Sequence, residues 1–231
     1  MKTHAWIMFC FVSLFVVQTL TAEAIEIDHT AISQRTINYT KHKYGLDAAR
    51  RVIAWSNLVI ENKDKSIAEK LMLTNKFFNN IPIKSEVEIW GHTHWSTPFE
   101  MLARNEGSQA DHVIGKYVTL EALGVPITHM HMTHVHSVVV PGQSYMVLTY
   151  SSKPDDMPLV LDTAKDEIRP GNERNDLIPE DSLNDDELWL SKTQSDGRND
   201  ADTEASTHVE LWNEMNKRMD HENLSDEGAA Y

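Results

Sequence analysis

The stretch GSQADHVIGKYVTLEALGVP, residues 107–126, decides the fold of this chain. Apolar residues recur in it at helical spacing, and Gly124-Val125-Pro126 ends the pattern. We therefore expect a helix over residues 109–123. Directly afterwards the apolar period changes to two, which predicts strands over residues 127–140, 145–150 and 159–162. Turn residues between these strands indicate an antiparallel meander.

Helical patterns also lie on either side of this stretch. Residues 46–60 and 66–79 carry apolar side chains near helical spacing, and Ser66 with Glu69 forms a capping box at the start of the second helix. A last helix is expected over residues 208–219. Helices that come first and a meander that follows them predict the α+β class.

Three other segments lack a clear period. Residues 25–44 are expected to be irregular or extended, and residues 87–98 to form a loop or a short strand. Thr97-Pro98 begins a short helix, because proline suits a first helical turn. Residues 191–206 form a polar loop by composition.

The first 24 residues have the features of a signal peptide. Lys2 precedes an apolar run over residues 5–17, and Ala22-Glu23-Ala24 matches a cleavage signal. The alternative is a retained span, but this run is shorter than the roughly 20 residues that a span needs. We expect cleavage after Ala24, one domain over residues 25–190, and an acidic loop, short helix and tail over residues 191–231.

Cysteine usage excludes several kinds of site. The chain has one cysteine, Cys10, and it lies within the predicted signal peptide. The exported chain would then have no disulfide, no zinc–thiolate site and no cysteine nucleophile.

The negative charge is concentrated in the last third of the chain. Of a net charge of −14, residues 155–231 contribute 22 of the 35 acidic residues and only 7 of the 21 basic ones. Binding to nucleic acid needs a basic face, so that class of function is excluded. We interpret the acidic third as a solvated surface.

Several motifs, in the same order, resemble those of one bacterial family. Residues 90–100 fit W-G-x-x-x-W-x-T-P-x-E, and residues 158–162 read P-L-V-L-D. Residues 107–112 stand where that family has G-D-C-E-D-Y, and residues 145–148 stand where it has H-M-V-L. On these motifs the chain resembles the LapG-type bacterial transglutaminase-like cysteine peptidases.

This resemblance implies a transglutaminase-core, papain-like fold, with N-terminal helices and a helix packed on an antiparallel sheet. In such a peptidase a thiolate at a helix start attacks, an imidazole moves the proton, and a carboxylate orients the imidazole. Gln109, Tyr145 and Asp162 occupy the corresponding positions, so only the acid remains. We expect an inactive relative in which Asp162 hydrogen-bonds Tyr145 or Gln109.

One pair of residues could substitute for the lost thiol and imidazole. Ser108 and His112 could act as nucleophile and base, although Ser108 is expected to be a helix cap.

The resemblance also implies calcium bound by acids around the nucleophile motif. Ser108 and Ala110 replace two of these acids and only Asp111 is left, so we expect weak or absent calcium binding.

Four histidines gather on one predicted strand. Alternation places His129 and His131 on one face, and His134 and His136 on the other. Either pair could hold zinc or copper with one further donor. Ordinary strand positions are the simpler interpretation.

The family also implies partners and a location. These are the N-terminal region of a surface adhesin and the periplasmic domain of an inner-membrane receptor for cyclic di-GMP. An exported, periplasmic, inactive relative would modulate adhesin release and biofilm retention by binding either partner. Two alternatives stay open: a hydrolase that uses Ser108 or a histidine-bound metal, and a scaffold that responds to metal or pH.

Overall fold

The computed structural model describes residues 34–183, 208, 210–220 and 222. The predicted signal peptide, residues 1–24, and the predicted polar loop, residues 191–206, lie outside these described residues, so the domain boundaries stay predictions. Among the helices that the structure describes, none is both long and apolar enough to cross a membrane.

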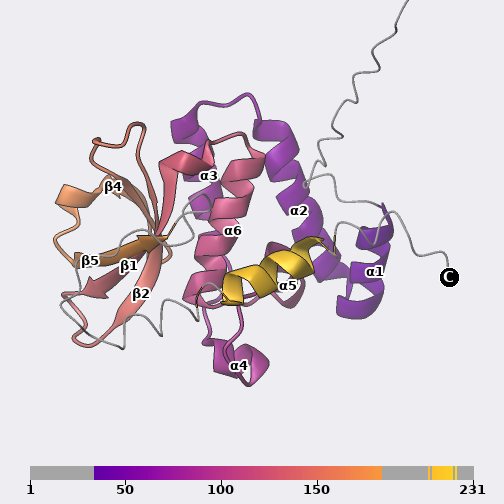
Figure 1. The fold of residues 1–231 in the computed structure, drawn as a ribbon. Helices are drawn as coiled ribbons and strands as arrows, with labels where there is room; N and C mark the ends of the chain where they lie inside the picture. The colour runs from indigo at the N-terminus through magenta and orange to yellow at the C-terminus, as the bar shows by residue number, and fades with distance from the viewer. Residues whose placement is uncertain (1–33, 184–207, 209, 221, 223–231) are drawn as a thin grey trace, which may run out of the picture.

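Helices come first in the described chain, and strands follow. The helices are α1 (Gln34–Tyr44), α2 (Leu46–Asn62), α3 (Ile67–Asn79), α4 (Glu86–Trp90), α5 (Pro98–Arg104) and α6 (Gln109–Ala122). The strands are β1 (Met130–Ser137), β2 (Ser144–Tyr150), β3 (Leu159–Asp162), β4 (Lys165–Pro170) and β5 (Leu177–Leu183). They form one antiparallel sheet in the order β4-β3-β2-β1-β5. Figure 1 shows the helices beside this sheet, which confirms the predicted α+β class.

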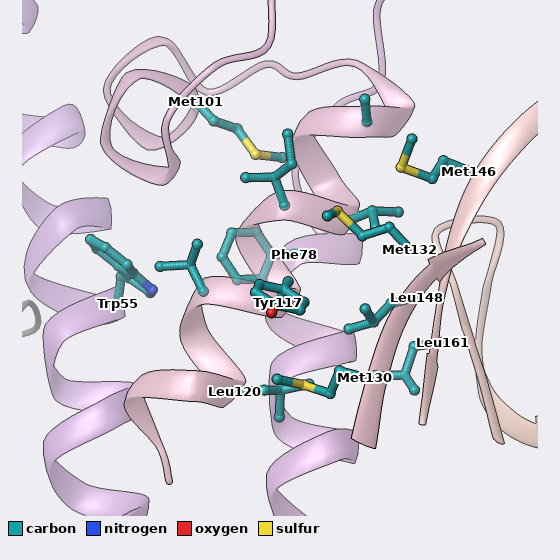
Figure 2. Close-up of a cluster of buried hydrophobic side chains, with 14 of the residues drawn as sticks. Trp55, Phe78, Met101, Tyr117, Leu120, Met130, Met132, Met146, Leu148 and Leu161 are labelled. Carbon is teal, nitrogen blue, oxygen red and sulfur yellow. The ribbon is translucent and has the colours of Figure 1, made fainter. Parts of the chain in front are cut away.

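Helix α6 lies between the sheet and the other helices (Figures 1 and 2). Eleven of its 14 residues are buried, because it is covered on several sides. Phe78 of α3 packs on one side, and Leu148 and Leu161 of the sheet belong to the same core. A fully buried side chain of this size contributes about 1.5–3 kcal/mol to stability. The stability of α6 thus comes from burial on most of its surface and not from a narrow apolar stripe along one side.

Serine or threonine caps fix where α3, α4, α5 and α6 begin. The predicted cap Ser66 of α3 and the predicted helix start at Thr97-Pro98 are confirmed, each with a complete capping box. Ser85 and Glu88 form the same motif at the start of α4. The predicted loop or short strand over residues 87–98 was therefore wrong at its start, where the Ser-x-x-Glu spacing marked a helix.

Helix α1 shows that the predicted irregular or extended start was wrong for residues 34–44, whereas residues 25–33 lie outside the described residues. It is an 11-residue helix with one buried residue, Thr40, whose hydroxyl donates to the carbonyl of Thr36 at 2.7 Å. Its sequence has too few apolar residues to show a period. The helix packs along α2, and tertiary contact of this kind supplies most of the stability of a weakly patterned helix.

The first predicted strand, residues 127–140, is shorter at both ends. A 3₁₀ turn (Ile127–His129) follows Pro126, and β1 begins only at Met130. After Ser137 the chain turns through residues 138–143, where Gly142 has a φ of +78°. Val139 in this turn is 72% exposed. Strands β4 and β5 were not predicted, since β4 has the charged sequence KDEIRP and lies at a sheet edge.

A terminal helix packs back onto the core. Residues 208, 210–220 and 222 are helical, which confirms the predicted last helix. Trp212 and Met215 are buried, and the Trp212 ring meets Tyr117 of α6 edge to face, with centroids 5.9 Å apart. This contact brings the acidic end of the sequence against the helix that carries Gln109.

Candidate functional site

Ser108 is the cap of α6, as predicted. Its hydroxyl accepts from the backbone N–H of Asp111 at 3.2 Å, and its own N–H donates to the Asp111 carboxylate at 2.8 Å. Gln109 is consequently the first residue of the helix, where backbone N–H groups and the helix dipole favour negative charge. Its side-chain Oε1 is buried and has no hydrogen-bond partner among the described residues.

Asp111 connects this helix start to the chain ahead of α5. One carboxylate oxygen accepts from the Ser96 N–H at 2.6 Å, and the other accepts from the Ser96 hydroxyl at 2.9 Å as well as from Ser108. The residue is 1% exposed. Both oxygens are therefore occupied by protein donors.

These contacts leave a poor fit for calcium at the start of α6. A calcium ion needs about six to eight oxygen ligands. The Asp111 carboxylate is engaged, Ala110 offers no side-chain oxygen, and the Ser108 hydroxyl caps the helix. In the described part of the chain, no cluster of three or more histidine, cysteine, aspartate or glutamate side chains could hold a metal ion.

Tyr145 and Asp162 form the predicted hydrogen bond. The Tyr145 hydroxyl, on β2, donates to Oδ2 of Asp162, at the end of β3, at 3.2 Å. Burial, reinforced by the negative charge of Asp162, raises the pKa of Tyr145 to about 12. The phenol thus keeps its proton at neutral pH and cannot serve as a base there.

Arg174 is the site residue that sequence reasoning did not assign. One of its terminal nitrogens lies 2.5 Å from Oδ2 of Asp162. The guanidinium also donates to both carboxylate oxygens of Asp176, at 2.9 and 3.0 Å, and these bonds hold the pKa of Asp176 well below its usual range. Arg174 and Asp162 are 3% and 0% exposed, so they form a buried ion pair. The sequence shows only that two opposite charges, Arg174 and Asp176, stand two residues apart.

Lys116 is buried deeper in the same region. It lies on α6 with no exposed surface, and its amine is 3.5 Å from the hydroxyl of Thr163. Burial lowers the pKa of Lys116 to about 7, although the charges of Asp162 and Asp166 oppose this shift. The amine of Lys116 is therefore close enough to the carboxylates of Asp162 and Asp166 to feel their charge.

His112 does not form a catalytic pair with Ser108. Its Nδ1 lies 2.7 Å from the backbone carbonyl of Ser108, and its Nε2 lies 3.0 Å from the carbonyl of Ile81. The ring is fully buried, and burial lowers the pKa of His112. Both ring nitrogens face backbone carbonyls, which leaves neither one to activate the Ser108 hydroxyl.

The histidine strand differs from its prediction. His129 belongs to the 3₁₀ turn and only His131 to β1, so the expected pairing of these two on one strand face was wrong. His134 meets His208 of the terminal helix, with ring centroids 4.9 Å apart. His136 is exposed, and its Nε2 lies against the carboxylate of Glu180. His134 and His136 therefore make separate local contacts.

Similarity to known proteins is found among solved structures. No family model and no curated protein matches the sequence. Among solved structures, Legionella pneumophila LapG matches with a TM-score of 0.66 and 32% identity, over 81% of this chain and 98% of that one. The EGTA-treated form of that protein gives the same values, and its calcium-bound form gives a TM-score of 0.65 over 99% of its length. With this identity over nearly the whole length of that protein, the chain belongs to the LapG family and has its transglutaminase-like fold.

Proposed function

We propose that this chain is an exported LapG-like protein that binds the partners of its family without cutting them. The observation that carries the proposal is the hydrogen bond between Tyr145 and Asp162. A phenol with a pKa near 12 occupies the place of the family's imidazole and engages the acid that would orient it.

The position of the nucleophile supports the same conclusion. Gln109 begins α6, where a thiolate would be stabilised by the helix start, but a carboxamide has no nucleophilic state of use in hydrolysis. The one cysteine of the chain, Cys10, lies in the predicted signal peptide. Two of the three catalytic positions therefore carry side chains of different chemistry.

The proposed partners are those that the family implies. They are the N-terminal region of a surface adhesin and the periplasmic domain of an inner-membrane cyclic di-GMP receptor. In the periplasm, an inactive copy would compete with an active peptidase for either partner and so change how much adhesin is released. The frame that surrounds the altered site, from the caps of α5 and α6 to the ion pair of Arg174, supports an intact binding surface.

Binding and cleavage can be measured in one experiment. The mature chain is incubated with an adhesin N-terminal fragment and, separately, with the receptor's periplasmic domain, and each mixture is analysed by pull-down and by gel for cleavage. We expect capture of at least one partner and an uncut adhesin fragment. Failure to capture either partner would contradict the proposal, as would cleavage that Tyr145→Phe or Asp162→Asn abolishes.

A matched gain-of-function variant tests the same scaffold. Gln109→Cys together with Tyr145→His restores the family's thiol and imidazole beside Asp162. We expect this variant to cut an adhesin fragment that the parent only binds, whereas Gln109→Cys alone should cut far less. A folded double variant that neither binds nor cuts would count against an intact substrate surface.

Hydrolysis by Ser108 gains no support from the geometry. Its hydroxyl is used as a cap, and the ring nitrogens of His112 face carbonyl groups. Turnover that disappears in Ser108→Ala would favour this alternative over the binding proposal, and turnover that disappears on addition of EDTA would favour a hydrolase with a histidine-bound metal.

A further inference from the structure

We infer that Asn75 and Asn79 of α3 are positioning residues, which hold the β3–β4 turn and thereby fix Asp162 within the site. The inference concerns the same site as the proposed function. It gives a role to two buried or half-buried amides of α3 that take no part in the catalytic positions.

Asn79 binds the β3–β4 turn at Asp162. Its side-chain amide donates to the backbone carbonyl of Asp162 at 3.0 Å and to that of Lys165 at 3.3 Å. It also donates to the carboxylate of Asp166 at 3.0 Å. Asp162 and Lys165 are paired residues of the two strands, so one amide spans both ends of the turn.

Asn75 holds the same turn from one helical turn earlier. Its amide donates to the carbonyls of Lys165 and Asp166 at 3.2 and 3.1 Å, and the residue has no exposed surface. The side-chain oxygens of both Asn75 and Asn79 have no partner in the described part of the chain. Both residues therefore act as donors, and their side-chain amides add hydrogen bonds to the backbone carbonyls of the turn.

Helix α3 is itself fixed against the helix that carries Gln109. The ring of Phe78 packs directly on Gly115 of α6, and a Cβ added to that glycine would lie 2.4 Å from the ring. Phe78 lies between the two asparagines in sequence, so one short helix contacts both α6 and the β3–β4 turn. Its packing sets the place of Asp162 relative to the start of α6.

The Asp162 carboxylate has partners besides Tyr145, and these orient it whatever side chain stands at position 145. Its Oδ1 accepts from the N–H of Ala164 at 2.9 Å, and its Oδ2 faces Arg174 at 2.5 Å. With its backbone held by Asn79, the acid keeps its position whether a phenol or an imidazole stands opposite. This arrangement explains how the site can lose its imidazole and keep an ordered Asp162.

The test uses an imidazole as a reporter of that position. Tyr145→His places a titrating ring beside Asp162, and NMR follows its pKa, with the signals of the native histidines identified by comparison with the parent chain. At this position the charge of Asp162 raises a pKa and that of Arg174 lowers it, so the Tyr145→His chain sets the reference value. Adding Asn79→Ala should lower the imidazole pKa by at least about half a unit, because the backbone of Asp162 is no longer held and its carboxylate can move away from the ring.

Asn80→Ala is the matched control. Asn80 lies next to Asn79, but its amide donates to the carbonyl of Lys76 in its own helix at 2.7 Å and does not reach the turn. We expect it to leave the imidazole pKa unchanged. If Asn79→Ala does not fold, Asn79→Ser, whose side chain is shorter, replaces it. An unchanged pKa in the folded Asn79 variant, or an equal shift in the Asn80 variant, overturns the inference.

These titrations contain neither adhesin nor receptor. A failure of the positioning role is therefore seen as an unmoved pKa, whereas a failure of the proposed function is seen as lost capture in the pull-down. The two results are independent.

Discussion

The hydroxyl of Thr97 donates to the carboxylate of Glu222 at 2.8 Å, across 125 residues of sequence. Thr97 also caps α5, so this bond attaches the terminal helix to the chain that leads into the site. Arg218 of the same helix lies 3.4 Å from Glu100, and His208 stacks on Trp95 with centroids 5.4 Å apart.

The attachment of the terminal helix should weaken as pH rises. Burial raises the pKa of Glu222 from 4.5 to about 8, the nearby charge of Glu100 adds to the shift, and Thr97 and Arg218 oppose it. The folded chain then binds the extra proton between pH 4.5 and 8, so the free energy of unfolding falls as pH increases through that range.

Urea unfolding at a series of pH values measures this effect. Glu222→Gln carries the neutral state permanently, and its stability should depend less on pH between 5 and 8. All other titratable groups are the same in the two proteins, so the difference between their stability curves isolates Glu222. Parallel stability curves for the two chains would rule the effect out.

Lys116 should produce the opposite slope at higher pH. Its pKa is lowered from 10.5 to about 7 in the folded chain, so the unfolded chain binds more protons between these values. The free energy of unfolding therefore rises with pH from 7 to 10.5, and the full cost of the buried charge is present below 7.

Lys116→Met removes that cost. We expect the variant to gain on the order of 1 kcal/mol or more at pH 6, because an apolar side chain replaces a buried amine with only a long contact to Thr163. Chemical denaturation at pH 6 and pH 9 checks the prediction. A variant that is less stable at pH 6 would mean that the amine has a stronger partner than Thr163.

Gly115→Ala should destabilise the chain. The new methyl group would collide with the Phe78 ring at 2.4 Å, which costs typically about 1–3 kcal/mol in a packed core. Phe78→Leu in the same chain should recover part of the loss, since the smaller side chain makes room. Gly171→Ala is the control, because its nearest atoms would be 3.6 Å away. Thermal unfolding that ranks Gly171→Ala below Gly115→Ala would contradict this packing.

Calcium should leave the melting temperature unchanged. Both oxygens of Asp111 already accept from protein donors, so a bound ion would have to break those bonds. Ser108→Asp with Ala110→Glu returns the family's two acids, and only that variant should melt at higher temperature with calcium than with EGTA. Calorimetry of both chains decides the point, and a calcium-dependent shift in the parent would refute it.

The sequence predicted the parts of the fold that depend on neighbouring residues. The caps Ser66, Thr97 and Ser108 are readable because a cap and its partner lie three residues apart. The core strands β1, β2 and β3 were found from their alternating apolar residues, and motif order predicted the family. Helix α4 was missed although its cap, Ser85, carried the same local signal.

Other features depend on segments that meet only after folding. Nothing near Arg174 in sequence indicates that it pairs with Asp162, and nothing near Asn79 indicates that it holds the β3–β4 turn. The weakly patterned helix α1 forms because it packs on α2. His129 lies outside β1, contrary to the prediction, because the chain makes a 3₁₀ turn after Pro126.

Composition and motif order alone thus predicted an α+β member of the LapG family, with Gln109 and Tyr145 at the family's cysteine and histidine positions. Only the tertiary structure showed the contacts at these positions: Tyr145 is hydrogen-bonded to Asp162, and Arg174 and Asn79 hold Asp162 in place. The physical reason is that a buried charge must find its partners wherever the fold places them, and those partners are distant in sequence.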